Sequence, residues 1–153
     1  MDKATASDQQ GEHVSDVDEL VRAETDQLAE VLDGLSDEQW EAASLCDGWR
    51  TRELVAHLLM PYELSVPSFL AKMVAARFSF DTVADRVATR DGRSNQDLVV
   101  ALRATPDRKF NVPGAPKEAP LSHVVIHSED VYRPLWDCGR REAPRLPTPR
   151  SSS

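Results

Sequence analysis

Two histidines placed four residues apart constrain the fold of this chain more than any other feature. His123 and His127 lie in the stretch 122–134. Side chains four residues apart share one face of an α-helix, so a helix here brings both imidazoles together. The apolar residues Val124 and Val131 recur at helical spacing beside them. Two imidazoles on the inner face of a helix can contribute to a metal site, but such a site needs three or four ligands.

Apolar residues recur at helical spacing elsewhere in the chain too, and no segment alternates with the period of two that is typical of a strand. Starting signals are Ser15 with Asp18, Ser36 with Gln39, Thr51, Ser65 with Pro67, and Ser94 with Asp97. Gly34 is expected to end the first helix, and Pro61 to end or kink the helix that follows Thr51. Residues 80–90 either continue the helix from Ser65 or form a separate one.

These patterns predict the all-α fold class. The prolines and the glycine in residues 105–120 predict an irregular connection before the last helix. Four principal helices around one core, with one long crossover connection, predict a four-helix bundle.

The ends of the chain differ in composition from the middle. Residues 1–12 are polar and are expected to be disordered, and residues 13–137 form the predicted bundle. Residues 138–153 carry four arginines against one glutamate, with three prolines and three final serines. Such a basic, irregular tail is typical of a linker, or of a truncated or altered reading frame. The second interpretation is preferred, because the preceding motif leads one to expect more protein.

Charge and composition exclude several classes of protein. The net charge of −8 disfavours nucleic acid and anionic membranes as partners, because both require a basic surface. No apolar run approaches the roughly 20 residues of a membrane span, and the first residues hold no apolar signal core. A cytoplasmic location is therefore predicted. The two cysteines, Cys46 and Cys138, do not indicate a disulfide framework.

A third metal ligand is offered by His57. It lies between Leu54 and Leu58 in the helix predicted after Thr51, so it is expected to face inward. A metal site in the core of a helical bundle can be built from one ligand on this helix and two ligands on the helix of His123 and His127. The alternative is that these are ordinary histidines near a core. His13 is excluded, because it borders the polar start of the chain.

Other residues near the histidines have two interpretations each. Asp130 can hold an imidazole N–H, or it can pair with Arg133 on the surface; Glu129 is expected to be a surface residue. Arg133 can also bind a substrate carboxylate. Cys46 is expected to pack against the core rather than to react. The tryptophans Trp40 and Trp49 are expected to cover the core.

Two segments carry a resemblance to a known family. Residues 45–58 read LCDGWRTRELVAHL, and residues 123–135 read HVVIHSEDVYRPL. In this order and spacing they resemble the mycothiol-dependent maleylpyruvate isomerase N-terminal family, which is part of the DinB-like superfamily. The likeness covers roughly residues 15–136, including the pattern formed by Leu32, Leu35 and Trp40.

The resemblance implies a DinB-like bundle that binds a divalent metal, usually zinc, through His57, His123 and His127. It also implies a low-molecular-weight thiol such as mycothiol as cosubstrate, and an S-transferase or isomerase acting on a small electrophile. In the isomerase itself a glutamate stands where this chain has His123, and relatives continue into a further domain. The alternatives are a non-catalytic metal-binding or structural protein and a metal-water hydrolase. Oligomerisation is left open.

Overall fold

The computed structural model describes the backbone of residues 4–142 and the side chains of residues 16–136, and its secondary structure confirms the all-α class. Apart from one isolated bridge between Ala43 and Arg50, no extended pairing occurs in the described residues. The elements are α1 (Ala4–Asp33), α2 (Asp37–Trp40), α3 (Thr51–Glu63), α4 (Val66–Ala75), α5 (Phe80–Thr89), α6 (Asn95–Arg103), the 3₁₀-helix η1 (Thr105–Asp107) and α7 (Ala119–Glu142).

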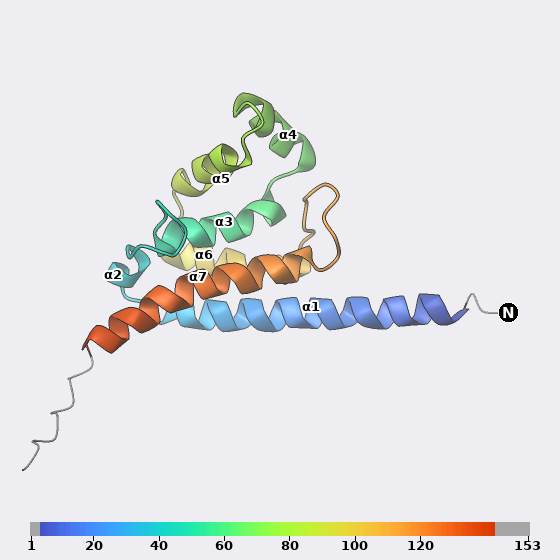
Figure 1. Ribbon diagram of the computed structural model, residues 1–153, viewed down its shortest axis with the longest axis horizontal. Helices are drawn as coiled ribbons and strands as arrows, with labels where there is room; N and C mark the ends of the chain where they lie inside the picture. The colour runs from blue at the N-terminus through green and yellow to red at the C-terminus, as the bar shows by residue number, and fades with distance from the viewer. Residues whose placement is uncertain (1–3, 143–153) are drawn as a thin grey trace, which may run out of the picture.

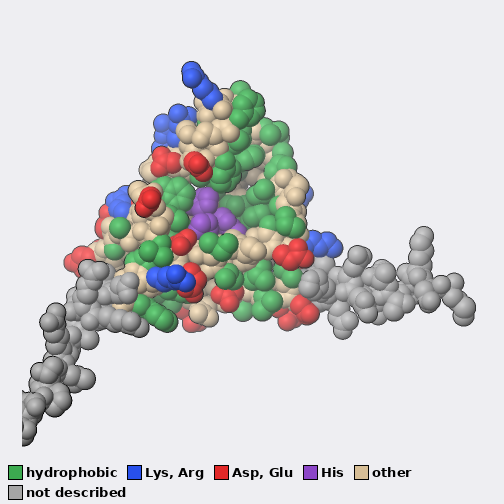
Figure 2. All heavy atoms as spheres, viewed as in Figure 1, with side chains coloured by type: hydrophobic (Ala, Val, Ile, Leu, Met, Phe, Trp, Pro, Cys, Tyr) green, Lys and Arg blue, Asp and Glu red, His purple; other side chains and the backbone are tan. Residues whose placement is uncertain are grey.

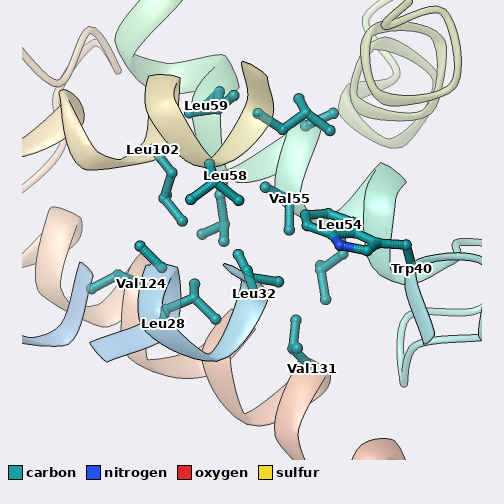
Figure 3. Packing of buried hydrophobic residues seen from close by; sticks show 14 of the residues in the cluster. Leu28, Leu32, Trp40, Leu54, Val55, Leu58, Leu59, Leu102, Val124 and Val131 are labelled. Atoms are coloured by element: carbon teal, nitrogen blue, oxygen red, sulfur yellow. The ribbon is translucent and has the colours of Figure 1, made fainter. Parts of the chain in front are cut away.

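Four of these helices surround the core. Helix α1 packs against α6 and α7, and α3 packs against the same two helices (Figure 1). Helices α4 and α5 lie beyond α3 and are joined to the rest mainly through contacts of α5 with α3. The core side chains come from all four inner helices, from Trp40 of α2 and from Ala88 of α5 (Figure 3). Its fully buried members include Leu28, Leu32, Leu54, Leu58, Leu98, Leu102 and Val131.

The predicted helix starts agree with the structure at several positions. Ser36 and Gln39 form a capping box, as do Ser94 and Asp97, and Ser65 caps α4. The start of α3 differs from the prediction, because Arg50 occupies the N-cap position and Thr51 is the first helical residue. The carboxylate of Glu53 accepts the backbone N–H of Arg50 at 3.0 Å, so the acidic side chain of the first turn supplies the cap.

The first helix begins earlier than predicted. Helix α1 starts at Ala4, so Ser15 lies inside it rather than capping it, and residues 4–12 are helical where disorder was expected. No proline interrupts this stretch, and a polar sequence without a breaker can extend a helix whose later turns are packed. Helix α1 ends at Asp33, just before Gly34, as predicted.

Two prolines lie inside helices. Pro61 was expected to end or kink the helix, but α3 continues to Glu63. Since proline has no N–H, the carbonyl of His57, four residues earlier, lacks its usual helical partner. Pro134 lies inside α7. The segment after Ser65 forms two helices rather than one, because Arg77 and Phe78 have positive φ angles of 53° and 65° between α4 and α5.

The last helix extends past the predicted boundary at residue 137. Helix α7 ends at Glu142, so the first residues of the predicted irregular tail are helical, and residues 143–153 lie outside the described part of the chain. None of the helices formed by the described residues combines the length and the apolar character that crossing a membrane requires.

Candidate metal centre

The three predicted histidines converge in one place. The ring centroids of His57 and His123 are 5.3 Å apart, those of His57 and His127 are 5.0 Å apart, and those of His123 and His127 are 4.9 Å apart. One ring nitrogen from each lies within 4.8 Å of the others. Figure 2 shows the imidazoles together at the floor of a recess in the surface. The geometry is that of a candidate metal site; ligation itself stays a prediction.

Helix packing fixes the position of each imidazole. His57 is flanked on α3 by Leu54 and Leu58, which are fully buried in the core. On α7 the buried residues Val124 and Val131 lie beside His123 and His127 and pack this side of the helix into the core. Because α3 packs directly on α7, the three side chains face one another across that contact. The amphipathic pattern of two helices therefore positions the whole cluster.

Burial keeps two of the imidazoles neutral. Desolvation, together with a smaller charge repulsion from the nearby His127, lowers the pKa of His57 from 6.5 to about 4. Desolvation lowers the pKa of His123 to about 3, with added repulsion from His127 and His57. Hydrogen bonding of the His123 ring to the backbone of Leu58 and His57 opposes that shift only in part. Neutral imidazoles retain the lone pairs that metal ions need.

Two of the ring nitrogens are buried without a partner. Nδ1 of His57 and Nε2 of His123 have no hydrogen-bond partner among the described residues. A buried polar atom left unsatisfied costs about 1–3 kcal/mol, so such atoms usually have a function or a ligand. A metal ion shared by these imidazoles would satisfy both atoms, and the donor set therefore fits a divalent metal.

The third imidazole is held by a carboxylate. Oδ2 of Asp130 lies 3.1 Å from Nδ1 of His127, one turn earlier on α7. The thiol of Cys46 donates to the same oxygen at 3.4 Å. Burial, together with the charge and hydrogen bond of Asp130, raises the pKa of Cys46 to about 11, so the sulfur stays protonated. With Nδ1 of His127 engaged by Asp130, its Nε2 is left for a metal.

Cys46 has a second role beside the expected one. It packs partly against the core, as predicted, but sequence reasoning missed its contact with Asp130. Cys46, His127 and Asp130 also form a second group of ligand atoms within 4.8 Å of one another. The two groups share His127, so they describe one continuous polar cluster rather than two separate sites.

The loop before α3 covers this cluster. The ring of Trp49 lies 4.9 Å from that of His57, and its indole N–H donates to Asp85 of α5 at 3.1 Å. The backbone N–H of Leu45 donates to the carbonyl of Asp130 at 3.3 Å, which ties the loop to α7. Gly48 adopts a φ of 81°, a left-handed conformation that glycine adopts without steric cost. Trp49 thus covers the site, whereas Trp40 is buried in the core.

A cavity of about 240 Å³ opens beside the histidines. All three imidazoles form part of its wall, and hydrophobic side chains surround them in Figure 2. Its other lining residues are Met60, Pro61, Leu64, Phe69, Phe80, Phe110, Asn111 and Val112. A larger cavity of about 360 Å³ beside α4 and α5 contains none of the three histidines. The convergence of three phenylalanines was not predicted, because they belong to three separate segments without a common spacing.

Two neighbouring charged residues lie outside the cluster. Arg133 donates to Glu129 at 3.2 Å on the exposed side of α7, and it is not among the residues lining the cavity. The alternative pair of Asp130 with Arg133 is therefore not formed, because Asp130 turns toward His127 and Cys46 instead. Glu129 is a surface residue, as predicted.

Comparison with known proteins gives one match. The family model described as mycothiol maleylpyruvate isomerase N-terminal domain matches residues 21–115. This range includes His57 and Cys46, but it ends before α7. No curated protein and no solved structure matches the chain.

Proposed function

Because this chain belongs to the mycothiol maleylpyruvate isomerase N-terminal domain family, we propose that it is a metal-dependent enzyme of the S-transferase or isomerase type. His57, His123 and His127 hold the metal, which is zinc, and a low-molecular-weight thiol such as mycothiol is the cosubstrate. One observation supports this proposal above the others: three imidazoles meet at the wall of an apolar cavity, and two of their buried nitrogens lack a partner.

The three imidazole ligands favour a zinc ion with one open coordination position. Three neutral nitrogen ligands leave one of the four tetrahedral positions free, as in catalytic zinc sites. Imidazole also suits other transition metals, whereas calcium and magnesium prefer oxygen ligands. When bound, zinc lowers the pKa of a thiol that coordinates it, and so supplies a thiolate nucleophile at neutral pH.

The surrounding residues hold and shield the site. Asp130 fixes the orientation and tautomer of His127 through the 3.1 Å contact with Nδ1. Trp49 covers His57, and the ring of Phe110 lies 5.8 Å from that of His123. These rings limit the access of water to the imidazoles, which strengthens electrostatic interactions at the cavity wall. Cys46 supports Asp130 as a neutral thiol, and it is not the nucleophile.

The test is thiol-dependent turnover by the full chain. Zinc-loaded and EDTA-treated protein are compared with 1-chloro-2,4-dinitrobenzene, with and without mycothiol. In this reaction a C–S bond forms, the C–Cl bond breaks, chloride leaves and the thiol proton passes to solvent. We expect turnover only when zinc and mycothiol are both present, and we expect it to survive Cys46→Ser.

Other results would favour the two alternatives. A metal-dependent reaction with ester substrates that ignores added thiol would contradict the transferase and indicate a metal-water hydrolase. Stoichiometric zinc without turnover, for a panel of thiols and electrophiles, would indicate a non-catalytic metal-binding protein. A cytoplasmic location remains a prediction, and it fits a thiol cosubstrate. Fractionation of cells that express the chain would test it.

A further inference from the structure

The cavity beside the histidines combines an aromatic wall with the three imidazoles. The side chains of Phe69, Phe80 and Phe110 come from α4, α5 and the connection before α7. Phe69 and Phe80 lie with ring centroids 6.2 Å apart, and Phe110 lies 5.8 Å from His123. The cavity therefore extends from the imidazoles to a wall of aromatic side chains.

Charged side chains are absent from the cavity wall. Among the described residues that line it, none is Lys, Arg, Asp or Glu. Two arginines are held by a carboxylate outside this wall: Arg93 pairs with Glu63 at 2.7 Å, and Arg108, two residues before Phe110, lies 3.7 Å from the same carboxylate. An anionic substrate would lose its hydration in this cavity without gaining a cationic partner from the chain, which is costly.

One amide is placed at the cavity wall. Asn111 donates its backbone N–H to the carbonyl of Pro61 at 2.7 Å, and this bond fixes the connection against the end of α3. Its side-chain amide can donate to or accept from an uncharged polar group such as a carbonyl or nitro group. A few placed polar groups in an otherwise apolar wall are typical of small-molecule sites.

We propose that the cavity selects an uncharged, apolar substrate that contains one aromatic ring, and that it discriminates against carboxylates. The inference rests on the proposed function, since it names the class of electrophile that meets the thiol. The size agrees: apolar cavities of roughly 150 Å³ hold benzene, and about 240 Å³ leaves room for substituents. The single feature that carries it is an aromatic wall that offers no cationic side chain, next to the three imidazoles.

Binding is tested without catalysis, on the full chain after EDTA treatment. The probes are methyl 4-fluorobenzoate and 4-fluorobenzoate, which share a ring and differ in charge, and ¹⁹F NMR titration measures both dissociation constants. We expect the ester to bind at least tenfold more tightly. Removing the metal matters, because a carboxylate could otherwise coordinate it directly.

Two variants test the location of the binding. Phe80→Ser removes part of the aromatic wall and should weaken binding of the ester at least threefold; Phe80 is 46% exposed, so the fold should tolerate the change. Val112→Arg places a cation at the wall and should bring the affinity for the carboxylate up to that for the ester. Val100→Arg is the matched control, because Val100 is 63% exposed on α6 and does not line the cavity. Circular dichroism checks that each variant is helical.

Several outcomes would overturn the inference. One is that the unmodified chain binds the carboxylate as tightly as the ester or more tightly, and another is that it binds neither probe. A third is that Val100→Arg changes the affinity for the carboxylate as much as Val112→Arg does. A failure of the proposed function is distinguishable from these. If the ester binds as expected but no thiol-dependent turnover occurs, the transferase is wrong and the binding preference stands.

Discussion

The carboxylate of Asp130 lies 3.1 Å from Nδ1 of His127 and accepts the thiol of Cys46 at 3.4 Å, so one oxygen joins the last helix to the loop before α3. A carboxylate behind an imidazole fixes the ring and raises its basicity as a ligand. This relationship predicts that Asp130 positions His127, and its effect on metal binding can be measured directly.

Replacing Asp130 should weaken metal binding without removing a ligand. For Asp130→Ala we expect zinc affinity to fall about ten- to hundredfold, the range typical of partners that support a ligand. Competition with a chromophoric chelator measures the change. Glu129→Ala is the matched control, because Glu129 contacts Arg133 on the exposed side of the same helix. Equal losses in the two variants would contradict a specific role for Asp130.

Removing any one of the three imidazoles should have a larger effect. His57→Ala, His123→Ala and His127→Ala each leave two nitrogen ligands, and two alone rarely hold zinc. We expect purified variants to contain far less zinc than the unmodified protein when measured by inductively coupled plasma mass spectrometry. His13→Ala is the control, because the sequence excludes His13 as a ligand, and this variant should retain the full amount. Normal zinc content in all three variants would exclude the site.

Acid should destabilise the metal-free protein through the buried histidines. The pKa of His57 is about 4 and that of His123 about 3 in the folded state, against 6.5 as the ordinary value. At a pH between the folded and the ordinary pKa, the unfolded chain binds more protons than the folded chain. The free energy of unfolding therefore rises with pH in this range, and stability is lost as the pH falls below about 6.5. Each group contributes a slope of up to about 1.4 kcal/mol per pH unit.

Urea unfolding in EDTA between pH 7 and pH 5 measures this slope. Other groups also titrate at low pH, so the informative quantity is the difference from a variant that lacks one imidazole. His123→Gln cannot take up the proton, and its stability should fall less steeply with acid than that of the unmodified chain. Parallel curves for the two proteins would show that His123 is not kept neutral by the fold.

Trp49 should report on the metal. Its ring lies 4.9 Å from that of His57, so ligation of His57 changes the surroundings of the indole. We expect zinc to change the fluorescence of the EDTA-treated protein, and Trp49→Phe to abolish most of that change. Trp136→Phe is the control, because Trp136 is 71% exposed and does not line the cavity beside the histidines. A zinc response that survives in Trp49→Phe would place the metal elsewhere.

Local sequence alone determined the all-α class and the shared face of His123 and His127, although several helix ends differ from the prediction. The i and i+4 spacing of His123 and His127 lies within five consecutive residues, so their place on one face follows from the local pattern without knowledge of the partner helix. The same is true of the caps at Ser36 and Ser94, where a side chain bonds to a backbone group three residues later. The inward orientation of His57 followed from its position between two leucines of an amphipathic helix.

Tertiary structure decided the interactions between distant segments. From the sequence, His127 and Arg133 were equally good partners for Asp130 on its own helix. The structure shows that Asp130 contacts His127, and that the loop carrying Cys46 packs against Asp130. The aromatic wall combines Phe69, Phe80 and Phe110 from segments whose approach depends on the packing of α3 against α5 and on the path of the connection. Periodicity identifies which face of a helix is apolar, but not which distant residue meets it, because that contact depends on how the helices pack.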